Sequence, residues 1–350
     1  MNRVLPLLIG AGLGATLLPA IGQAQVTGAQ IYGQLHVSAD YLDTDSRGSA
    51  LNLSSNASRL GFRGKYEVQE QLTVVWQAET TLRVDSQGGD LIDRDTFLGL
   101  TGDWGLLRVG KFDTPMKVLR NRTDIFPNQV GDARNITRNR IAAPAGLASG
   151  QIGWDERFRN SIHYRTPTVA GLTANAQYST SLNSASSNDA DAGSWSASVE
   201  WRLDTFWIAV AHENQTYTDD VLPDYERQAT RVAALYDIGD FRLSALYQKA
   251  EDPDDAAWGA GVRYRLTEKV ALKTQYYHLD ADADDSDADL YAVGADYQVA
   301  PNLTFYANYA VLDNDTLSNL RPYSQARTAD PTSLAGNSPS GFSLGTIFSF

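Results

Sequence analysis

The chain has 350 residues and a formal net charge of −13, from 29 Lys and Arg against 42 Asp and Glu. It contains no cysteine, which excludes a disulfide framework, a thiolate zinc site and a thiol nucleophile. Nucleic-acid binding depends on basic residues that neutralise phosphates, so no nucleic-acid partner is expected for so acidic a chain. The mean hydropathy of −0.32 is too low for a bundle of membrane-spanning helices.

Residues 1–24 have the pattern of a secretory signal peptide. Arg3 gives a basic start, Val4–Ile21 is uncharged and mostly apolar or small, and a small-residue cleavage pattern ends at Ala24. We expect cleavage after Ala24, which leaves one unit of residues 25–350 with a net charge of −14, because Arg3 is the only charge removed. A single membrane anchor is the alternative, but two prolines and several glycines interrupt the stretch.

Apolar and polar residues alternate with a period of two along most of the remaining chain. In Leu72–Arg83, for example, Val74 and Trp76 alternate with Gln77 and Glu79. Such alternation is typical of β-strands with one apolar and one polar face. It predicts 16 strands, at residues 31–41, 52–68, 71–84, 91–102, 105–112, 156–166, 171–180, 194–203, 205–216, 226–238, 240–250, 257–266, 269–279, 288–299, 302–313 and 341–350.

Short and long connections take turns between these strands, as Gly239-Asp240 and Asn314–Ser340 illustrate. The polar faces are rich in Arg, Lys, Glu and Gln, and aromatic residues gather near strand ends. This combination is typical of an outer-membrane β-barrel, whose backbone groups all find partners only if the sheet closes. We therefore expect the last strand to pair with the first, around a water-filled lumen. A water-soluble β-sandwich is the alternative explanation of the alternation.

Motifs spread over the chain resemble the general diffusion porins of Gram-negative outer membranes. The segments that carry the resemblance are Ile31–Leu35, Ser58–Gly64, Arg94–Leu100, Arg159–Ile162 and the terminal Phe350. The resemblance implies an all-β fold: a 16-stranded antiparallel transmembrane β-barrel with an inward-folded third loop. It also implies a homotrimer in the outer membrane, in contact with lipid and lipopolysaccharide, that passes ions and small hydrophilic solutes without a cofactor.

The resemblance places an acidic group of the pore constriction on the third loop, here Thr114–Gly150. Asp124 matches the main loop carboxylate and Asp132 is expected to be the second. Asn128 stands where enterobacterial members carry a further acid, which weakens the negative side of the constriction.

The opposing wall is expected to carry arginines. Arg59 and Arg94 fall on the family's arginine positions, and Arg63 and Arg159 are expected on polar faces nearby. Opposed rows of Arg and Asp orient polar solutes and set ion preference, and arginine keeps its charge at any working pH. An excess of cations on the loop favours weak anion preference, whereas the acidic exterior would concentrate cations at the mouth.

Three other functions are compatible with parts of this pattern. A channel that prefers a substrate, such as an oligosaccharide, phosphate or a carboxylate, is the main alternative. A structural or adhesive barrel would need a plugged lumen or a large external domain. No catalytic motif is present and the four histidines are scattered, so an enzyme is not expected. The six aspartates of Asp280–Asp289 suggest either a solvated loop or a site for divalent cations, although no metal is expected.

Overall fold

The computed structural model describes residues 28–87, 91–142, 151–180, 193–217, 225–325, 327 and 329–350. The expected signal peptide, residues 1–24, lies outside these residues. No helix within the described ranges is long and apolar enough to cross a membrane.

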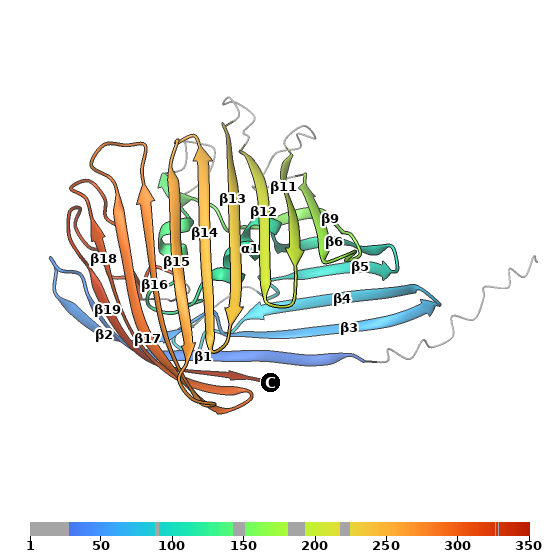
Figure 1. Cartoon of the computed structure of the whole chain (residues 1–350), viewed down its shortest axis with the longest axis horizontal. Coiled ribbons are helices and arrows are strands. Elements are labelled where there is room, and N and C mark those ends of the chain that lie inside the picture. Colours follow the sequence, from blue (N-terminus) through green and yellow to red (C-terminus); the bar gives the residue numbers. More distant parts are fainter. Residues whose placement is uncertain are drawn as a thin grey trace, which may run out of the picture.

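Within the described residues, seventeen strands form one closed antiparallel sheet. The first and last strands pair from Gln34↔Ser349 to Asp43↔Ser340, which confirms the expected closure. Figure 1 shows the strands arranged around a common axis. The strands are β1 (Gln30–Asp43), β2 (Ser49–Ser55), β3 (Arg59–Gln69), β4 (Leu72–Thr81), β5 (Thr96–Gly102), β6 (Gly105–Asp113), β9 (Arg157–Arg165), β10 (Leu172–Ser179), β11 (Ser194–Arg202), β12 (Phe206–Tyr217), β13 (Tyr225–Ile238), β14 (Phe241–Glu251), β15 (Ala256–Arg265), β16 (Val270–Asp280), β17 (Ala288–Ala300), β18 (Leu303–Asn314) and β19 (Ser340–Ser349).

The barrel is 16-stranded because β2 and β3 are two parts of one strand, and both pair with β1. The predicted strand 52–68 is therefore wrong at one point, where it breaks at residues 56–58. Ala57 has a φ of 56°, outside the β region, and the Ser58 hydroxyl donates to the carbonyl of His36. The predicted strand 91–102 also begins late, at Thr96, since Ile92 has a φ of 61°.

The two faces of the sheet follow the predicted alternation. In β14, Leu243 and Tyr247 are exposed, whereas Ser244 and Gln248 are buried. The same division recurs around the barrel, so large apolar side chains form one continuous face and polar side chains the other. An apolar outer face is the surface that a lipid bilayer accepts, and the polar face surrounds the interior.

Exposed aromatic side chains form two rows near the strand ends. Tyr247 of β14 pairs with Trp258 of β15, and the exposed Phe241 of β14 pairs with Tyr264 of β15, which is half-buried. The two pairs are six residues apart along β14, or about 20 Å at the usual strand rise. This separation is close to the height of the apolar band between the aromatic girdles of outer-membrane barrels.

Tight turns join the strands at one end of the barrel. Between β13 and β14, Gly239 has a φ of 58°, a left-handed conformation that favours glycine in a two-residue hairpin turn. The side chain of its neighbour Asp240 accepts hydrogen bonds from the Arg265 guanidinium. The backbone N–H of Arg265 also donates to the Asp240 carbonyl. These turns fix the register that keeps the apolar side chains on one face.

The connection from β6 to β9 contains both α-helices of the described residues. Helix α1 (Pro115–Thr123) is capped by Thr114, whose hydroxyl accepts a hydrogen bond from the Lys117 N–H. Helix α2 (Arg134–Thr137) is a single turn. Two short strands, β7 (Ile141–Ala142) and β8 (Gln151–Ile152), pair with each other.

Candidate functional site

The segment 114–139 packs against the polar face of the sheet. Met116 and Leu119 of α1 are fully buried in a cluster with Trp207 and alanines of β12 and β13. Burial of each of these side chains contributes about 1.5–3 kcal/mol. Because α1 contacts β10 to β14, it is joined to a wide arc of the barrel wall.

Small residues on β15, β17 and β18 make room for the part of the segment that follows α1. A Cβ atom on Gly261 would lie 2.5 Å from Ile125 Cγ1, and one on Gly294 would lie 3.0 Å from Phe126 Cε1. Gly131 has a φ of 90°, and a Cβ atom there would lie 2.6 Å from that of Ala292. The chain therefore approaches the wall more closely than larger side chains would allow.

Polar side chains of the wall also hold the segment. Gln275 of β16 accepts a hydrogen bond from the Ile125 N–H at 3.0 Å and donates to the Gly131 carbonyl at 2.6 Å. Arg231 of β13 donates to the Met116 carbonyl at 2.8 Å. These bonds satisfy backbone groups that would otherwise be buried without partners.

A buried ionic network centred on Arg120 connects residues of the segment to Asp155 and to Arg231 of β13. Its guanidinium lies 3.5 Å from Asp124, 3.8 Å from Asp132 and 3.3 Å from Asp155, which is also paired with Arg231 at 2.6 Å. Burial alone would lower the pKa of Arg120, but Asp155, Asp132 and Asp124 together raise it. Arg120 therefore stays charged and joins α1 to the part of the chain that follows it.

The two predicted loop carboxylates are both part of this network, and both side chains are fully buried. Burial, followed by the charge of Asp132, raises the pKa of Asp124 to about 8. Burial also tends to raise the pKa of Asp132, but Arg134 and Arg120 lower it below its usual value. The pair therefore shares one proton near neutral pH, with the negative charge on Asp132. Neither residue is among those that line the cavity described next.

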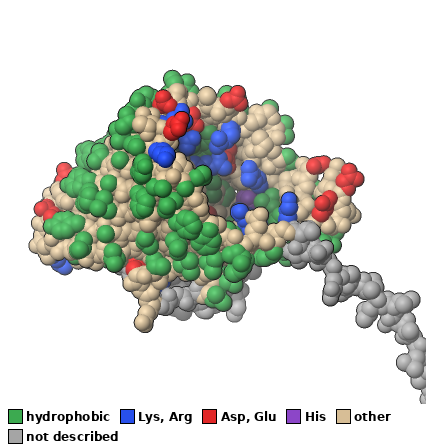
Figure 2. Space-filling model, turned by 90° about the horizontal axis from the view of Figure 1, so that it is seen from below, with side chains coloured by type: hydrophobic (Ala, Val, Ile, Leu, Met, Phe, Trp, Pro, Cys, Tyr) green, Lys and Arg blue, Asp and Glu red, His purple; other side chains and the backbone are tan. Residues whose placement is uncertain are grey.

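A cavity of about 720 Å³ lies beside the segment, between β3, β4, β6 and the connection from β18 to β19. Figure 2 shows Lys and Arg side chains gathered at a hollow on one face of the molecule. Ten of the lining residues are basic and only four are acidic. The basic ones are Arg59, Arg83, Arg94, Lys117, Arg120, Arg134, Arg138, Arg140, Arg157 and Arg327.

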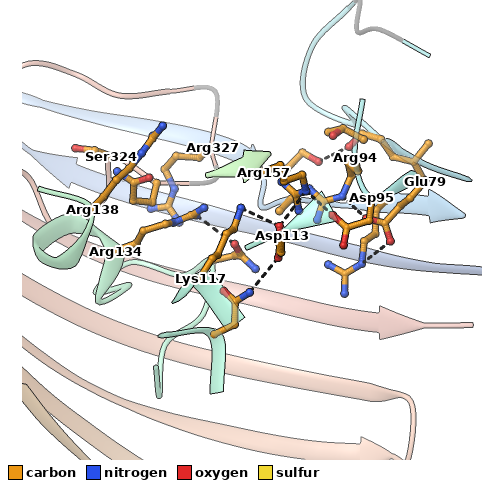
Figure 3. Close-up of a pocket in the computed structure, with 18 of the residues that line it drawn as sticks. Glu79, Arg94, Asp95, Asp113, Lys117, Arg134, Arg138, Arg157, Ser324 and Arg327 are labelled. Carbon is orange, nitrogen blue, oxygen red and sulfur yellow. Dashed lines mark hydrogen bonds and ion pairs between the residues drawn. The ribbon is translucent and has the colours of Figure 1, made fainter. Parts of the chain in front are cut away.

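At one end of the cavity, arginines alternate with carboxylates (Figure 3). The Glu79 carboxylate lies 2.5 Å from Arg94 and 3.7 Å from Arg59, so the two predicted wall arginines share one acid. Beyond them, Arg157 lies 2.5 Å from Asp95 and 3.0 Å from Asp113.

The other end of the cavity is almost purely basic. Figure 3 places Arg134 and Arg138 beside Arg327 and Ser324, with Lys117 between them and the acidic end. Arg327 comes from the connection 315–339, whose Pro322 carbonyl accepts hydrogen bonds from the Gly131 N–H and the Asn135 side chain. This second connection thus packs on the first.

Two predicted wall residues lie elsewhere. Arg63 is exposed, stacks over the Tyr32 ring at 4.7 Å and donates to Gln30 at 3.2 Å. Arg159 is exposed and lines a separate hollow with Val109 and Ile162, two side chains of the apolar face. The structure therefore brings Arg59 and Arg94 together and separates them from Arg63 and Arg159.

Sequence reasoning missed Arg157 and Arg327 as cavity residues, along with the acid Glu79. Period two could have identified Glu79, because it follows Gln77 on the polar face of β4. No local pattern marks Arg327, since its own partners are distant in the chain: its guanidinium donates to Asn56, 271 positions earlier, and pairs with Asp40.

The acidic run 280–289 is engaged within its own hairpin. Asp289 bonds to Tyr276 and His278, and Asp287 accepts from the Ala281 N–H at 2.9 Å. Across the described ranges, no group of three or more acidic or histidine side chains is arranged to hold a metal ion.

Comparisons with known proteins concern nearly the whole chain. A family model described as Gram-negative porin matches residues 11–317. The major outer membrane protein P.IB of Neisseria gonorrhoeae is 25% identical over 264 residues, which cover 69% of this chain and 70% of that protein. The P.IB protein of Neisseria sicca is 27% identical over 170 residues, and this match spans 46% of this chain and less than half of that protein, 43%.

Solved structures share the fold. The anion-selective porin from Comamonas acidovorans has a TM-score of 0.78 at 22% identity, over 92% of this chain and 99% of that one. The trimer form of in-vitro folded OmpT, an outer membrane protein of Vibrio cholerae, has a TM-score of 0.65 at 19% identity, over 92% and 99% of the two chains.

Proposed function

The chain belongs to the Gram-negative porin family and forms an outer-membrane channel for passive diffusion, and we propose that this channel prefers anions. The observation that carries the proposal is the excess of ten basic over four acidic residues around the cavity. Fixed positive charge in a narrow aqueous passage raises the local concentration of anions and lowers that of cations. The anion-selective porin from Comamonas acidovorans has the same fold.

The segment 114–139 is the proposed constriction, folded into the lumen as the third loop. Its many contacts with the polar face of the wall support this position. In this proposal Arg59 and Arg94 supply the field of the wall, weakened by Glu79 between them. The loop contributes cations, because its two predicted carboxylates are buried around Arg120 and share a proton.

The zero-current potential of the purified protein in a planar bilayer tests this proposal directly. Under a KCl gradient we expect the sign that corresponds to chloride preference. Replacing Arg59 and Arg94 together by Gln should move the zero-current potential toward the value expected for cation preference. Arg63→Gln should leave it nearly unchanged. The preference should also weaken as the salt concentration rises, because the Debye length falls from about 10 Å at 0.1 M to about 3 Å at 1 M. Cation preference of the wild-type channel would refute the proposal.

We also propose that the protein is a homotrimer in contact with lipid and lipopolysaccharide. The apolar face is markedly exposed on β2 and β5, where Leu51, Leu53 and Leu98 are 78%, 77% and 57% exposed. The trimer form of OmpT provides a precedent in the same fold. Conductance that closes in steps of one third, together with a gel band of three times the monomer mass before heating, is the expected result. A single conductance step per protein would contradict it.

A further inference from the structure

A small hollow opens at the basic end of the cavity. Its volume is about 80 Å³, on the order of a few water molecules. Four arginines line it and none of its lining residues is acidic; the other lining groups include the Ser324 hydroxyl and amides of Asn and Gln. We call it the arginine hollow and define it by Arg134, Arg138, Arg140 and Arg321.

The arginine hollow is continuous with the larger cavity, because the two share Arg134, Arg138, Arg140, Ser324 and Gln325. It is built from two connections that lie far apart in the sequence. Three of its arginines come from α2 and the residues directly after it, and the fourth comes from the connection 315–339. A solute in the larger cavity therefore has direct access to it.

The counter-charges of these arginines lie outside the hollow. Arg134 lies 3.5 Å from the buried Asp132, Arg138 pairs with Glu156, and Arg321 pairs with Asp330 at 2.7 Å. None of these three acids lines the hollow. Arg140 forms no ion pair with any residue that the structure describes.

Several donors at this end also lack acceptors. Within the described part of the chain, the buried Nε atoms of Arg134 and Arg138 have no hydrogen-bond partner. The side chain of Arg327 behind them is fully buried, with its Nε atom 3.9 Å from the Asp40 carboxylate. Within the described residues its Nε and Nη1 atoms make no hydrogen bond. Burying a donor without a partner is costly, and these guanidinium groups are therefore incompletely compensated by the protein's own acceptors.

Repulsion among the arginines of the hollow also favours the binding of an anion. Burial and the neighbouring charges of Arg138 and Arg134 together lower the pKa of Arg140 to about 10, against opposing effects of Asp330 and Glu156. A cluster of like charges in this state gains free energy when an anion binds among them.

We propose that the arginine hollow is a binding site for a compact oxyanion, either phosphate or a small dicarboxylate. Guanidinium groups present pairs of N–H donors in one plane, which match two oxygens of one anion. Chloride cannot make such a bidentate contact. The site rests on the proposed anion preference and adds to it a saturable step, in which an oxyanion pauses at the constriction.

The test is block of chloride current in a planar bilayer at a fixed KCl concentration. Inorganic phosphate is titrated in one series and succinate in another, with monovalent acetate for comparison. The wild-type channel should show a saturable decrease in conductance with phosphate, succinate or both, and little effect of acetate. Which of the two acts more strongly identifies the preferred anion.

Arg140→Gln is the main variant, because Arg140 has no ion pair to disturb in the described structure, and Arg138→Gln is the second. Each should raise the half-blocking concentration about tenfold, as expected for loss of one charge-assisted contact. Arg63→Gln is the matched control outside the cavity and should change it less than about twofold. Heat-modifiable mobility on gels shows that each variant has folded.

Two results would overturn the site: a wild-type response to both anions that never saturates, or unchanged block in Arg140→Gln and Arg138→Gln. The proposed anion preference is judged separately, from the zero-current potential and from Arg59→Gln. Arg59→Gln should alter that potential and leave the half-blocking concentration of phosphate nearly unchanged.

Discussion

Individual charges in this barrel have different roles according to what surrounds them. Asp124 and Asp132 lie eight positions apart on one connection, and both were expected to face the pore. Instead they share Arg120, with their side chains fully buried. Glu79, which has no place in the predicted constriction, lies between the two arginines that line it. Charge type alone therefore does not identify the residues that act on a passing ion.

The shared proton makes the two aspartates unequal, which a pair of substitutions can test. Asp124→Asn should be tolerated near neutral pH, because the wild-type side chain is protonated there and its Oδ1 contacts can persist. Asp132→Asn should lower the free energy of unfolding by about 1–3 kcal/mol, because it leaves Arg120 and Arg134 short of a buried counter-charge. Thermal unfolding in detergent, followed by loss of β-sheet circular dichroism, measures both. Equal destabilisation by the two variants would contradict the assignment.

The pH dependence follows from the same pair. The pKa of Asp124 is raised to about 8 in the folded protein, so between pH 4 and pH 8 this carboxyl binds one more proton in the folded state than in the unfolded state. Its contribution to stability should therefore be lost as pH rises through this range, with no further change above pH 8. Asp124→Asn should flatten this dependence. A wild-type stability that rises over the same range with an identical slope in the variant would refute it.

At the scale of the elements, the strands were predictable and the connections were not. Strand positions follow from alternation, which is local, and β14 with its exposed Leu243 and buried Ser244 is a clear case. Arg59 and Arg94 were predicted from motifs that resemble strands of the porin family, and the structure places both in the lining of the cavity. Arg327 and the arginine hollow depend on the folding of two long connections against each other, for which no periodic signal exists. The break at Ala57 was missed although the sequence marks it: apolar side chains stand at odd positions before it, as in Leu51 and Leu53, and at even positions after it, as in Leu60 and Phe62.

The close fit of the segment 114–139 to the wall gives a prediction at this scale. Gly261→Leu should push Ile125 away from β15, at a cost of about 1–3 kcal/mol from overpacking. We expect a lower unfolding temperature and more frequent partial closures of single channels. Ala245→Leu on the exposed face of neighbouring β14 is the matched control. Normal gating and stability of Gly261→Leu would show that the segment does not need this contact.

At the scale of the whole molecule, the barrel closes at one seam, the pairing of β1 with β19. The backbone of Phe350 exchanges hydrogen bonds with Gly33 at 2.9 and 3.1 Å, and a Cβ atom on Gly33 would lie 2.4 Å from the Phe350 ring. The terminal aromatic ring thus covers a glycine in the first strand. Closure between β1 and β19 was predicted from the sequence and is confirmed, because both strands keep the alternation up to the seam.

Loss of that ring should impair closure. Phe350→Ala keeps the backbone bonds but removes about 1 kcal/mol of apolar contact, since the side chain is half exposed. We expect a smaller heat-modifiable fraction after refolding into detergent micelles than for Leu344→Ala, which removes an exposed side chain within the same strand. Equal refolding of the two variants would show that the seam forms without the ring.

The connection 315–339 contributes both to the exposed surface and to the lining of the cavity, which limits how its sequence can change in evolution. Its Leu317 and Leu334 are exposed, while Arg327 of the same connection lines the cavity. Insertions or exchanges that alter the exposed surface of this connection would therefore also alter the permeability of the channel. Variants that change this surface without losing permeability should keep Pro322 and Arg327 and change exposed positions such as Leu317 and Leu334.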